Sequence, residues 1–128
     1  MKPKNKTVLI LEDEKPLFEL IKSKFETEGF NAVTAKSVAQ ALQCLKSGVK
    51  IDVIWLDHYL YGKKDGIDFV TQIKKPRSVW KNLPIFLISN TVSAEKVKAY
   101  LKLGINKYYP KTESQLGKII TDIKKFLK

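Results

Sequence analysis

The chain has 128 residues, with 24 Lys and Arg against 13 Asp and Glu, a single Cys and 44% hydrophobic residues. A chain of this length buries roughly two thirds of its unfolded surface, which suffices for one core without disulfides or a structural metal. Because Cys44 is the single cysteine, it makes no disulfide bridge within the chain, and this usage is typical of a reducing compartment. No apolar run approaches the roughly 18 residues of a membrane span, and residues 1–6 are too short and polar for a signal peptide, so we expect a cytoplasmic protein.

The net charge of +11 raises the question of nucleic-acid binding, because phosphate backbones attract clustered cations. All the cations except Arg77 are Lys, and they are spread over nearly every segment, as on solvated helix faces. Arg is the better reader of bases, so this bias makes nucleic acid an unlikely partner. The densest basic stretch, residues 74–81, is predicted to be a surface loop.

Apolar runs of strand length alternate with stretches whose apolar residues recur at helical spacing. The first run, TVLIL, is continuous and rich in β-branched residues, which is typical of a strand covered on both faces. In chain order, the expected strands are residues 7–11, 30–34, 52–56, 85–89 and 107–109. The helices between and after them are expected from Pro16 to about Gly29, from Ser37 to Gly48, from Gly66 to Pro76, from about Ser93 to Gly104, and over residues 116–127. This order predicts an α/β protein, with one doubly wound parallel sheet of five strands and five helices, and a single domain over residues 1–128.

Polar side chains follow four of the predicted strands. Ligands of an open parallel sheet bind beyond the carboxyl ends of its strands, so these residues are expected to face one site. Neighbouring carboxylates repel one another unless a cation neutralises them, and oxygen ligands of this kind suit Mg²⁺ together with a phosphate. The sequence thus predicts a pocket for Mg²⁺ and a phosphoryl group beside an ammonium. Its candidate residues are Glu12, Asp13, Glu14, Asp57, Ser89, Asn90 and Lys111.

This arrangement closely resembles the receiver domain of two-component response regulators, of the single-domain, chemotaxis-regulator-like kind, over essentially the whole chain. The successive spacings of 44, 32 and 22 residues from Asp13 to Lys111 fit the layout of that family. The resemblance implies a flavodoxin-like fold with strand order 2-1-3-4-5. It rests on the pair Glu12-Asp13 and on Asp57, Ser89, Tyr108 and Lys111.

The resemblance implies that Asp57 accepts a phosphoryl group from a phosphohistidine of a sensor kinase or a phosphotransfer protein. Lys111 would pair with one phosphoryl oxygen and Ser89 would hydrogen-bond another. Such a domain is not an enzyme in its own right and assists only its own phosphotransfer and dephosphorylation. The implied cofactor is Mg²⁺, held by Glu12, Asp13, Asp57 and the backbone carbonyl of Tyr59.

The resemblance also implies a switch formed by Ser89 and Tyr108. Movement of Ser89 toward the phosphoryl group would let Tyr108 turn inward. The surface of the fourth helix, fifth strand and fifth helix would then change and control an unknown downstream protein. We expect a monomer or weak homodimer.

Three further residues near the site carry expectations. Tyr59 is bulky and is predicted to screen the phosphoryl group from water, which would slow self-dephosphorylation. Thr112 stands where the family usually has a proline after Lys111. His58 is predicted to face away from the pocket, because neighbouring residues leaving a strand alternate sides.

Two other classes of function compete with this interpretation. A phosphatase of the haloacid dehalogenase type also uses an Asp nucleophile and Mg²⁺, but the second acid of its D-x-D motif is replaced here by Lys15. The glycine motifs of dinucleotide and P-loop nucleotide binding do not occur in the sequence. The remaining alternative is a phosphate-independent binding module that contacts nucleic acid through its basic surface, for which steep salt dependence of DNA binding would be the signature.

Overall fold

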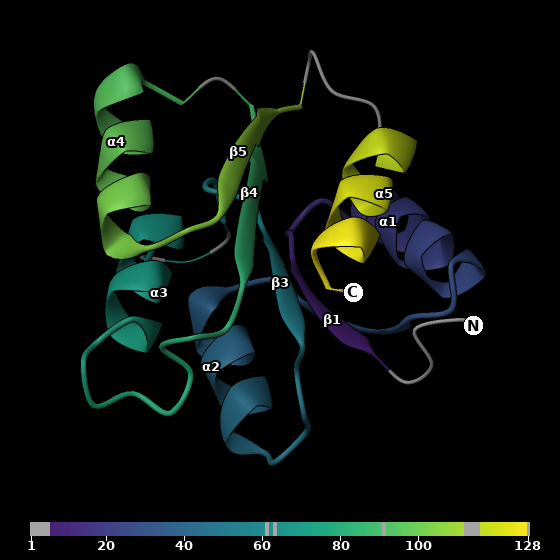
Figure 1. The fold of residues 1–128 in the computed structure, drawn as a ribbon, viewed down its shortest axis with the longest axis horizontal. Coiled ribbons are helices and arrows are strands. Elements are labelled where there is room, and N and C mark those ends of the chain that lie inside the picture. Colours follow the sequence, from purple (N-terminus) through teal and green to yellow (C-terminus); the bar gives the residue numbers. More distant parts are fainter. Residues whose placement is uncertain (1–5, 61, 63, 91, 112–115, 128) are drawn as a thin grey trace.

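The computed structural model describes residues 6–60, 62, 64–90, 92–111 and 116–127. Its five strands are all parallel and form one sheet in the order β2-β1-β3-β4-β5, which confirms the predicted fold class and strand order (Figure 1). None of the described helices is long and apolar enough to cross a membrane. The strands are β1 (Thr7–Leu11), β2 (Asn31–Ala35), β3 (Val53–Leu56), β4 (Ile85–Ser89) and β5 (Lys107–Pro110). The helices are α1 (Lys15–Thr27), α2 (Val38–Lys46), α3 (Gly66–Ile73), α4 (Ala94–Leu103) and α5 (Leu116–Phe126).

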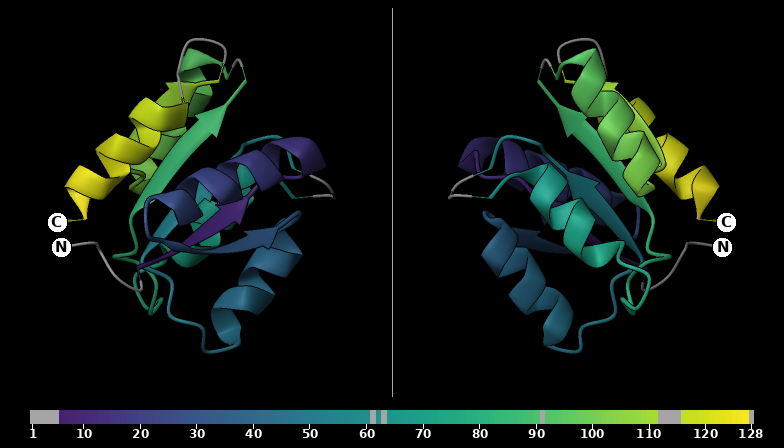
Figure 2. Two further views of the ribbon diagram at one scale, coloured as in Figure 1. Left: turned by 90° about the vertical axis from the view of Figure 1, so that its right-hand side faces the viewer. Right: turned by 90° about the vertical axis from the view of Figure 1, so that its left-hand side faces the viewer.

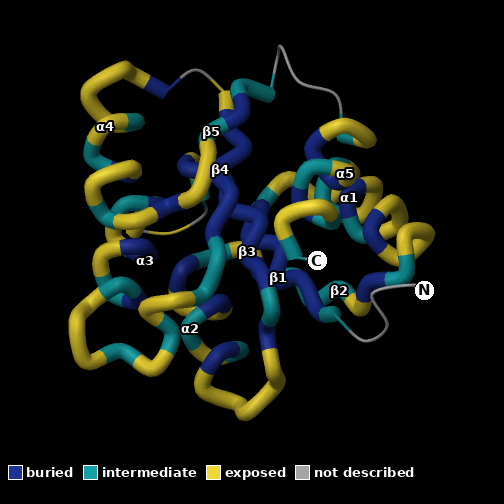
Figure 3. Tube along the Cα trace, in the orientation of Figure 1, coloured by how far each residue is buried: buried dark blue, intermediate teal, exposed yellow. Residues whose placement is uncertain are grey.

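The sheet is covered by helices on both faces, and each face has its own hydrophobic core. Alternate strand residues such as Val8 and Trp55 pack against α1 and α5, while their neighbours Leu9 and Leu56 pack against α2, α3 and α4. Figure 2 shows these two helical layers on opposite sides of the sheet. Because both faces are covered, the three central strands β1, β3 and β4 form the buried centre of the molecule, whereas the edge strands β2 and β5 are partly exposed (Figure 3).

Local capping signals define where the helices begin and end. The Ser37 hydroxyl accepts the backbone N–H of Gln40 at 3.2 Å and caps α2. Asp65 and Asp68 form a reciprocal capping box at the start of α3. Gly104 ends α4 with φ of 110°, a conformation that favours glycine. The capping box also anchors the connection between β3 and α3, which follows directly after Asp57.

The parallel register brings the carboxyl ends of the central strands to one edge of the sheet. Leu11 of β1 pairs with Leu56 of β3, so the residues that follow them lie side by side. Ser89 of β4 pairs with Pro110 of β5, so Lys111 leaves the sheet at the same edge. The predicted site residues therefore converge through strand pairing, although they are distant in sequence.

Replacement of Ser37 by Ala should lower the free energy of unfolding by about 1 kcal/mol, because the first turn of α2 loses the acceptor for a backbone N–H. Ser23→Ala is the matched control, since Ser23 is exposed within α1 and caps no helix. Urea unfolding of both variants measures the difference. Equal stability of the two variants would contradict the capping role.

Candidate functional site

Three carboxylates meet at the carboxyl edge of the sheet. Oxygen atoms of Glu12, Asp13 and Asp57 all lie within 4.8 Å of one another. Glu12 and Asp57 are buried, with only 1% and 4% of their surface exposed. Such a concentration of negative charge away from water is unfavourable without a positive partner.

Lys111 supplies that partner from the end of β5. Its Nζ atom lies 2.7 Å from Glu12 Oε1 and 3.3 Å from Asp57 Oδ2. The backbone N–H of Lys111 donates to the carbonyl of Ser89 at 2.9 Å, which ties the base of this side chain to β4. Lys111 thus points into the site; Thr112, where the family usually has a proline, lies outside the described residues.

Ser89 connects β4 to Asp57, the residue that follows β3. It is fully buried, and its hydroxyl donates to Asp57 Oδ1 at 2.6 Å. The same hydroxyl oxygen accepts the backbone N–H of His58 at 3.3 Å, and the N–H of Tyr59 lies 3.4 Å from Asp57 Oδ1. With Lys111 on Oδ2, both oxygens of the Asp57 carboxylate are held by donors in a fixed orientation.

The electrostatics of the site follow from burial and charge. Burial, together with the nearby charge of Asp57, raises the pKa of Glu12 from 4.5 to about 7, and the hydrogen bond from Lys111 only partly opposes this shift. Burial disfavours the charged form of Lys111, but its hydrogen bond to Glu12 and the charges of Asp57 and Glu12 outweigh burial and raise its pKa. The ammonium therefore stays charged and neutralises part of the acidic cluster.

A cavity of about 610 Å³ opens above the carboxylates. The acidic cluster and Lys111 line its interior, and the backbone turn after Asp57 forms another wall. The Asp57 carboxylate borders this space, whose volume exceeds that of a phosphoryl group. Its remaining lining residues include Tyr59, Asn90, Lys64 and Lys96.

The donor set fits Mg²⁺. The ligands are oxygen atoms only, and Mg–O bonds of about 2.0–2.1 Å require ligand oxygens roughly 3–4 Å apart, close to the separation of the three carboxylates. Glu12, Asp13 and Asp57 are the residues that could hold the ion. Tyr59 follows two residues after Asp57 at the cavity wall, and the role of its carbonyl as a ligand stays a prediction.

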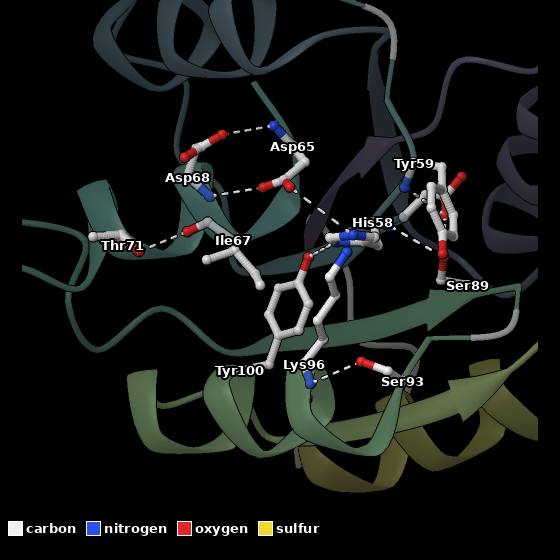
Figure 4. Close-up of polar contacts among 11 residues, drawn as sticks. His58, Tyr59, Asp65, Ile67, Asp68, Thr71, Ser89, Ser93, Lys96 and Tyr100 are labelled. Atoms are coloured by element: carbon white, nitrogen blue, oxygen red, sulfur yellow. Dashed lines mark hydrogen bonds and ion pairs between the residues drawn. The ribbon is translucent and has the colours of Figure 1, made fainter. Parts of the chain in front are cut away.

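A second polar cluster next to Asp57 was not predicted from the sequence. The His58 imidazole is buried and lies 2.5 Å from the hydroxyl of Tyr100, a residue of α4 (Figure 4). Its Nε2 atom lies 3.9 Å from Asp65. Burial lowers the pKa of His58. The only sequence signal was the hydroxyl itself, since a buried Tyr usually finds a hydrogen-bond partner.

The fold and this site define a doubly wound α/β domain with an acidic pocket at the carboxyl edge of its sheet. The chain belongs to the response regulator receiver domain family, whose family model matches residues 8–124. Members of this family are signalling domains of two-component systems and not classical enzymes. They are phosphorylated by histidine kinases and typically bind Mg²⁺ at an acidic pocket.

Individual relatives agree with this assignment. The transcriptional regulatory protein CpxR of Escherichia coli K12 is 31% identical over 104 residues, which cover 81% of this chain and 42% of CpxR. A putative NtrX-like response regulator of Rickettsia conorii is 32% identical over 105 residues, covering 81% of this chain and 21% of the relative. The chain thus spans less than half the length of these curated relatives.

Solved structures show the same fold. The receiver domain of Francisella response regulator 1452 superimposes with a TM-score of 0.82 at 28% identity and covers 96% of both chains. A CheY-like receiver domain protein from Methanospirillum hungatei gives a TM-score of 0.85 at 19% identity, covering 97% of this chain and 94% of that one. The likeness to the second structure concerns the fold alone.

In metal-free buffer, the free energy of unfolding of the wild type should fall relative to Glu12→Gln as the pH rises from 4.5 to 7. The folded protein raises the pKa of Glu12 to about 7, so it binds this proton more tightly than the unfolded chain, and stability is lost as the proton leaves. The shift in the pKa of Glu12 corresponds to a change of about 3 kcal/mol at most in the free energy of unfolding.

Urea unfolding across this pH range measures the effect. His58 titrates in both proteins, so the difference between them isolates Glu12. A difference that stays constant with pH would contradict the prediction.

Proposed function

We propose that this chain is a phosphorylation-dependent signalling switch whose phosphoacceptor is Asp57. The observation that carries the proposal is the setting of this carboxylate, which borders the cavity with Ser89 bonded to one oxygen and Lys111 to the other. A carboxylate is a weak nucleophile, but attack on phosphorus in line with the leaving group needs mainly positioning and charge neutralisation. The site supplies both.

The donor would be a phosphohistidine of a sensor kinase or a phosphotransfer protein. An oxygen of Asp57 forms a bond to phosphorus while the P–N bond breaks, and the electron pair of that bond remains on the imidazole nitrogen. Lys111 is placed to pair with a phosphoryl oxygen, at the cost of its bond to Asp57 Oδ2. Mg²⁺, held by Glu12, Asp13, Asp57 and the Tyr59 carbonyl, would neutralise negative charge on the transferred group.

The output of the switch would be a change in the surface formed by α4, β5 and α5. Phosphorylation adds roughly −1.5 to −2 charge and new acceptor oxygens beside Ser89. We propose that the Ser89 hydroxyl then donates to the phosphoryl group and that Tyr108 turns inward. Tyr108 is half-buried on β5 and packs against the core beneath α4, a position that supports this role. The altered surface would bind or release a downstream protein.

The distribution of charge along the chain favours one alternative function, a phosphate-independent module that binds nucleic acid. Residues 61–128 carry 15 of the 24 Lys and Arg but only 5 of the 13 Asp and Glu, so this half holds +10 of the net charge of +11. A basic half of this kind suits a phosphate-independent module that binds nucleic acid. The intact arrangement of Asp57, Ser89 and Lys111 supports the switch more strongly, because a binding module needs none of these contacts.

Incubation with acetyl phosphate and Mg²⁺ should add one phosphoryl group to the wild type and none to Asp57→Ala, because Ser89 orients one oxygen of the Asp57 carboxylate and Lys111 orients the other. Intact mass spectrometry measures the uptake. Asp52→Ala is the matched control: Asp52 lies near the opposite end of β3, where it accepts the N–H of Thr7, and its loss should leave uptake unchanged. Uptake that persists in Asp57→Ala would reassign the acceptor.

Tyr59→Asn should lose its phosphoryl group several-fold faster than the wild type. The Tyr59 ring lies at the cavity, packed edge-to-face on His58 with ring centres 4.7 Å apart, where it can exclude water from the phosphoryl group. Tyr59→Phe keeps the ring and should retain the slow rate. Loss of the added mass with time measures both rates; equal rates in the wild type and Tyr59→Asn would discard the shielding role.

A further inference from the structure

His58 joins the proposed acceptor site to helix α4. Its backbone N–H donates to the Ser89 hydroxyl, which in turn donates to Asp57. Its imidazole Nδ1 lies 2.5 Å from the hydroxyl of Tyr100. The residue directly after the acceptor is thus bonded through its backbone to the site and through its side chain to α4 (Figure 4).

Tyr100 is built into this position from the α4 side. Tyr100 is fully buried, and its hydroxyl lies close to the backbone at Gly66. A Cβ atom added at Gly66 would collide with this hydroxyl. Gly66 is in turn held by its N–H, which donates to the carbonyl of His58 at 3.2 Å. The hydroxyl therefore reaches the connection between β3 and α3, directly beside Asp57.

Packing alone does not account for this hydroxyl. Phe would fill the same space beneath α4, and burial of a hydroxyl is costly unless it is hydrogen-bonded. Its partner His58 is also buried, with 2% of its surface exposed, so neither group can turn to water for a replacement bond. The ring of His58 packs edge-to-face on both Tyr59 and Tyr100, which gives a continuous contact from the cavity wall to α4.

We propose that the hydrogen bond between His58 and Tyr100 transmits the phosphorylation state of Asp57 to helix α4. The inference rests on the proposed phosphoacceptor function. When Ser89 turns its hydroxyl toward a phosphoryl oxygen, the His58 N–H loses its acceptor, and the shift of His58 moves the hydroxyl of Tyr100. Tyr100 is a positioning residue in this scheme, because it acts on the site only through His58.

The test compares Tyr100→Phe with Tyr109→Phe. Tyr109 is also a buried Tyr, but its hydroxyl donates to Asp122 of α5 at 2.6 Å in a part-buried contact, so this variant loses one tyrosine hydroxyl away from the link. Each protein is treated with acetyl phosphate and Mg²⁺. Intact mass gives the phosphoryl uptake, and amide hydrogen exchange of residues 94–103 gives the response of α4.

We expect wild-type uptake in both variants. The quantity compared is the ratio of the α4 exchange rates with and without phosphorylation. This ratio should differ from one several-fold in the wild type and in Tyr109→Phe, and it should fall close to one in Tyr100→Phe. A purely structural role of the hydroxyl would speed exchange equally in the two states and leave the ratio unchanged. Exchange in α1 reports whether each variant is folded.

His58→Leu provides a second variant if Tyr100→Phe proves unstable. His58→Leu should also abolish the response of α4 to phosphorylation. The double variant of His58 and Tyr100 should show the same loss of response as either single variant, because both changes remove the same hydrogen bond. A wild-type ratio in folded Tyr100→Phe or His58→Leu would overturn the link alone. Absence of uptake in the wild type would instead overturn the phosphoacceptor function, and the link with it.

Discussion

The pairing of Lys111 with Glu12 and Asp57 is the interaction on which the site depends. Three carboxylates within 4.8 Å of one another at a mostly buried edge of the sheet would otherwise favour protonation or local opening. The ammonium lies within 3.3 Å of two of them and remains charged because of them. The same charges suit the site to two further ions. The carboxylates would attract a divalent cation, and the ammonium of Lys111 would attract a phosphoryl group.

This balance is possible only because the sheet brings separate strand ends together. Glu12 follows β1, Asp57 follows β3, Ser89 ends β4 and Lys111 follows β5, and parallel pairing aligns these ends at one edge. Cores on both faces of the sheet hold the strands in this register. Asp57, the proposed acceptor, thus rests on a rigid support, whereas the connections after the strands carry the groups that would respond to phosphorylation.

Two aromatic residues link this support to the surface of α4, β5 and α5. Tyr108 lies on β5 and packs toward α4, while Tyr100 lies on α4 itself and reaches back to His58. Family resemblance points to the role of Tyr108, whereas the role of Tyr100 follows from the tertiary structure alone. Because both contact the core beneath α4, the proposed switch would couple the position of this helix to events at both β4 and β3. Helix α4 is therefore the element through which the proposed switch would be read.

The order of strands and helices could be predicted from the amino-acid sequence, because alternating apolar runs, capping residues and helical spacing are local properties. The sequence also identified Glu12, Asp13, Asp57, Ser89 and Lys111, since residues that follow parallel strands must share an edge. Three further features depend on the packed fold: Lys111 bonds Glu12, burial and Asp57 raise the pKa of Glu12, and Tyr100 contacts His58. The last pair is separated by 42 residues. Helical spacing shows that Tyr100 faces the core, but which polar atom its hydroxyl meets there depends on how α4 is placed against the sheet, and no local pattern encodes that placement.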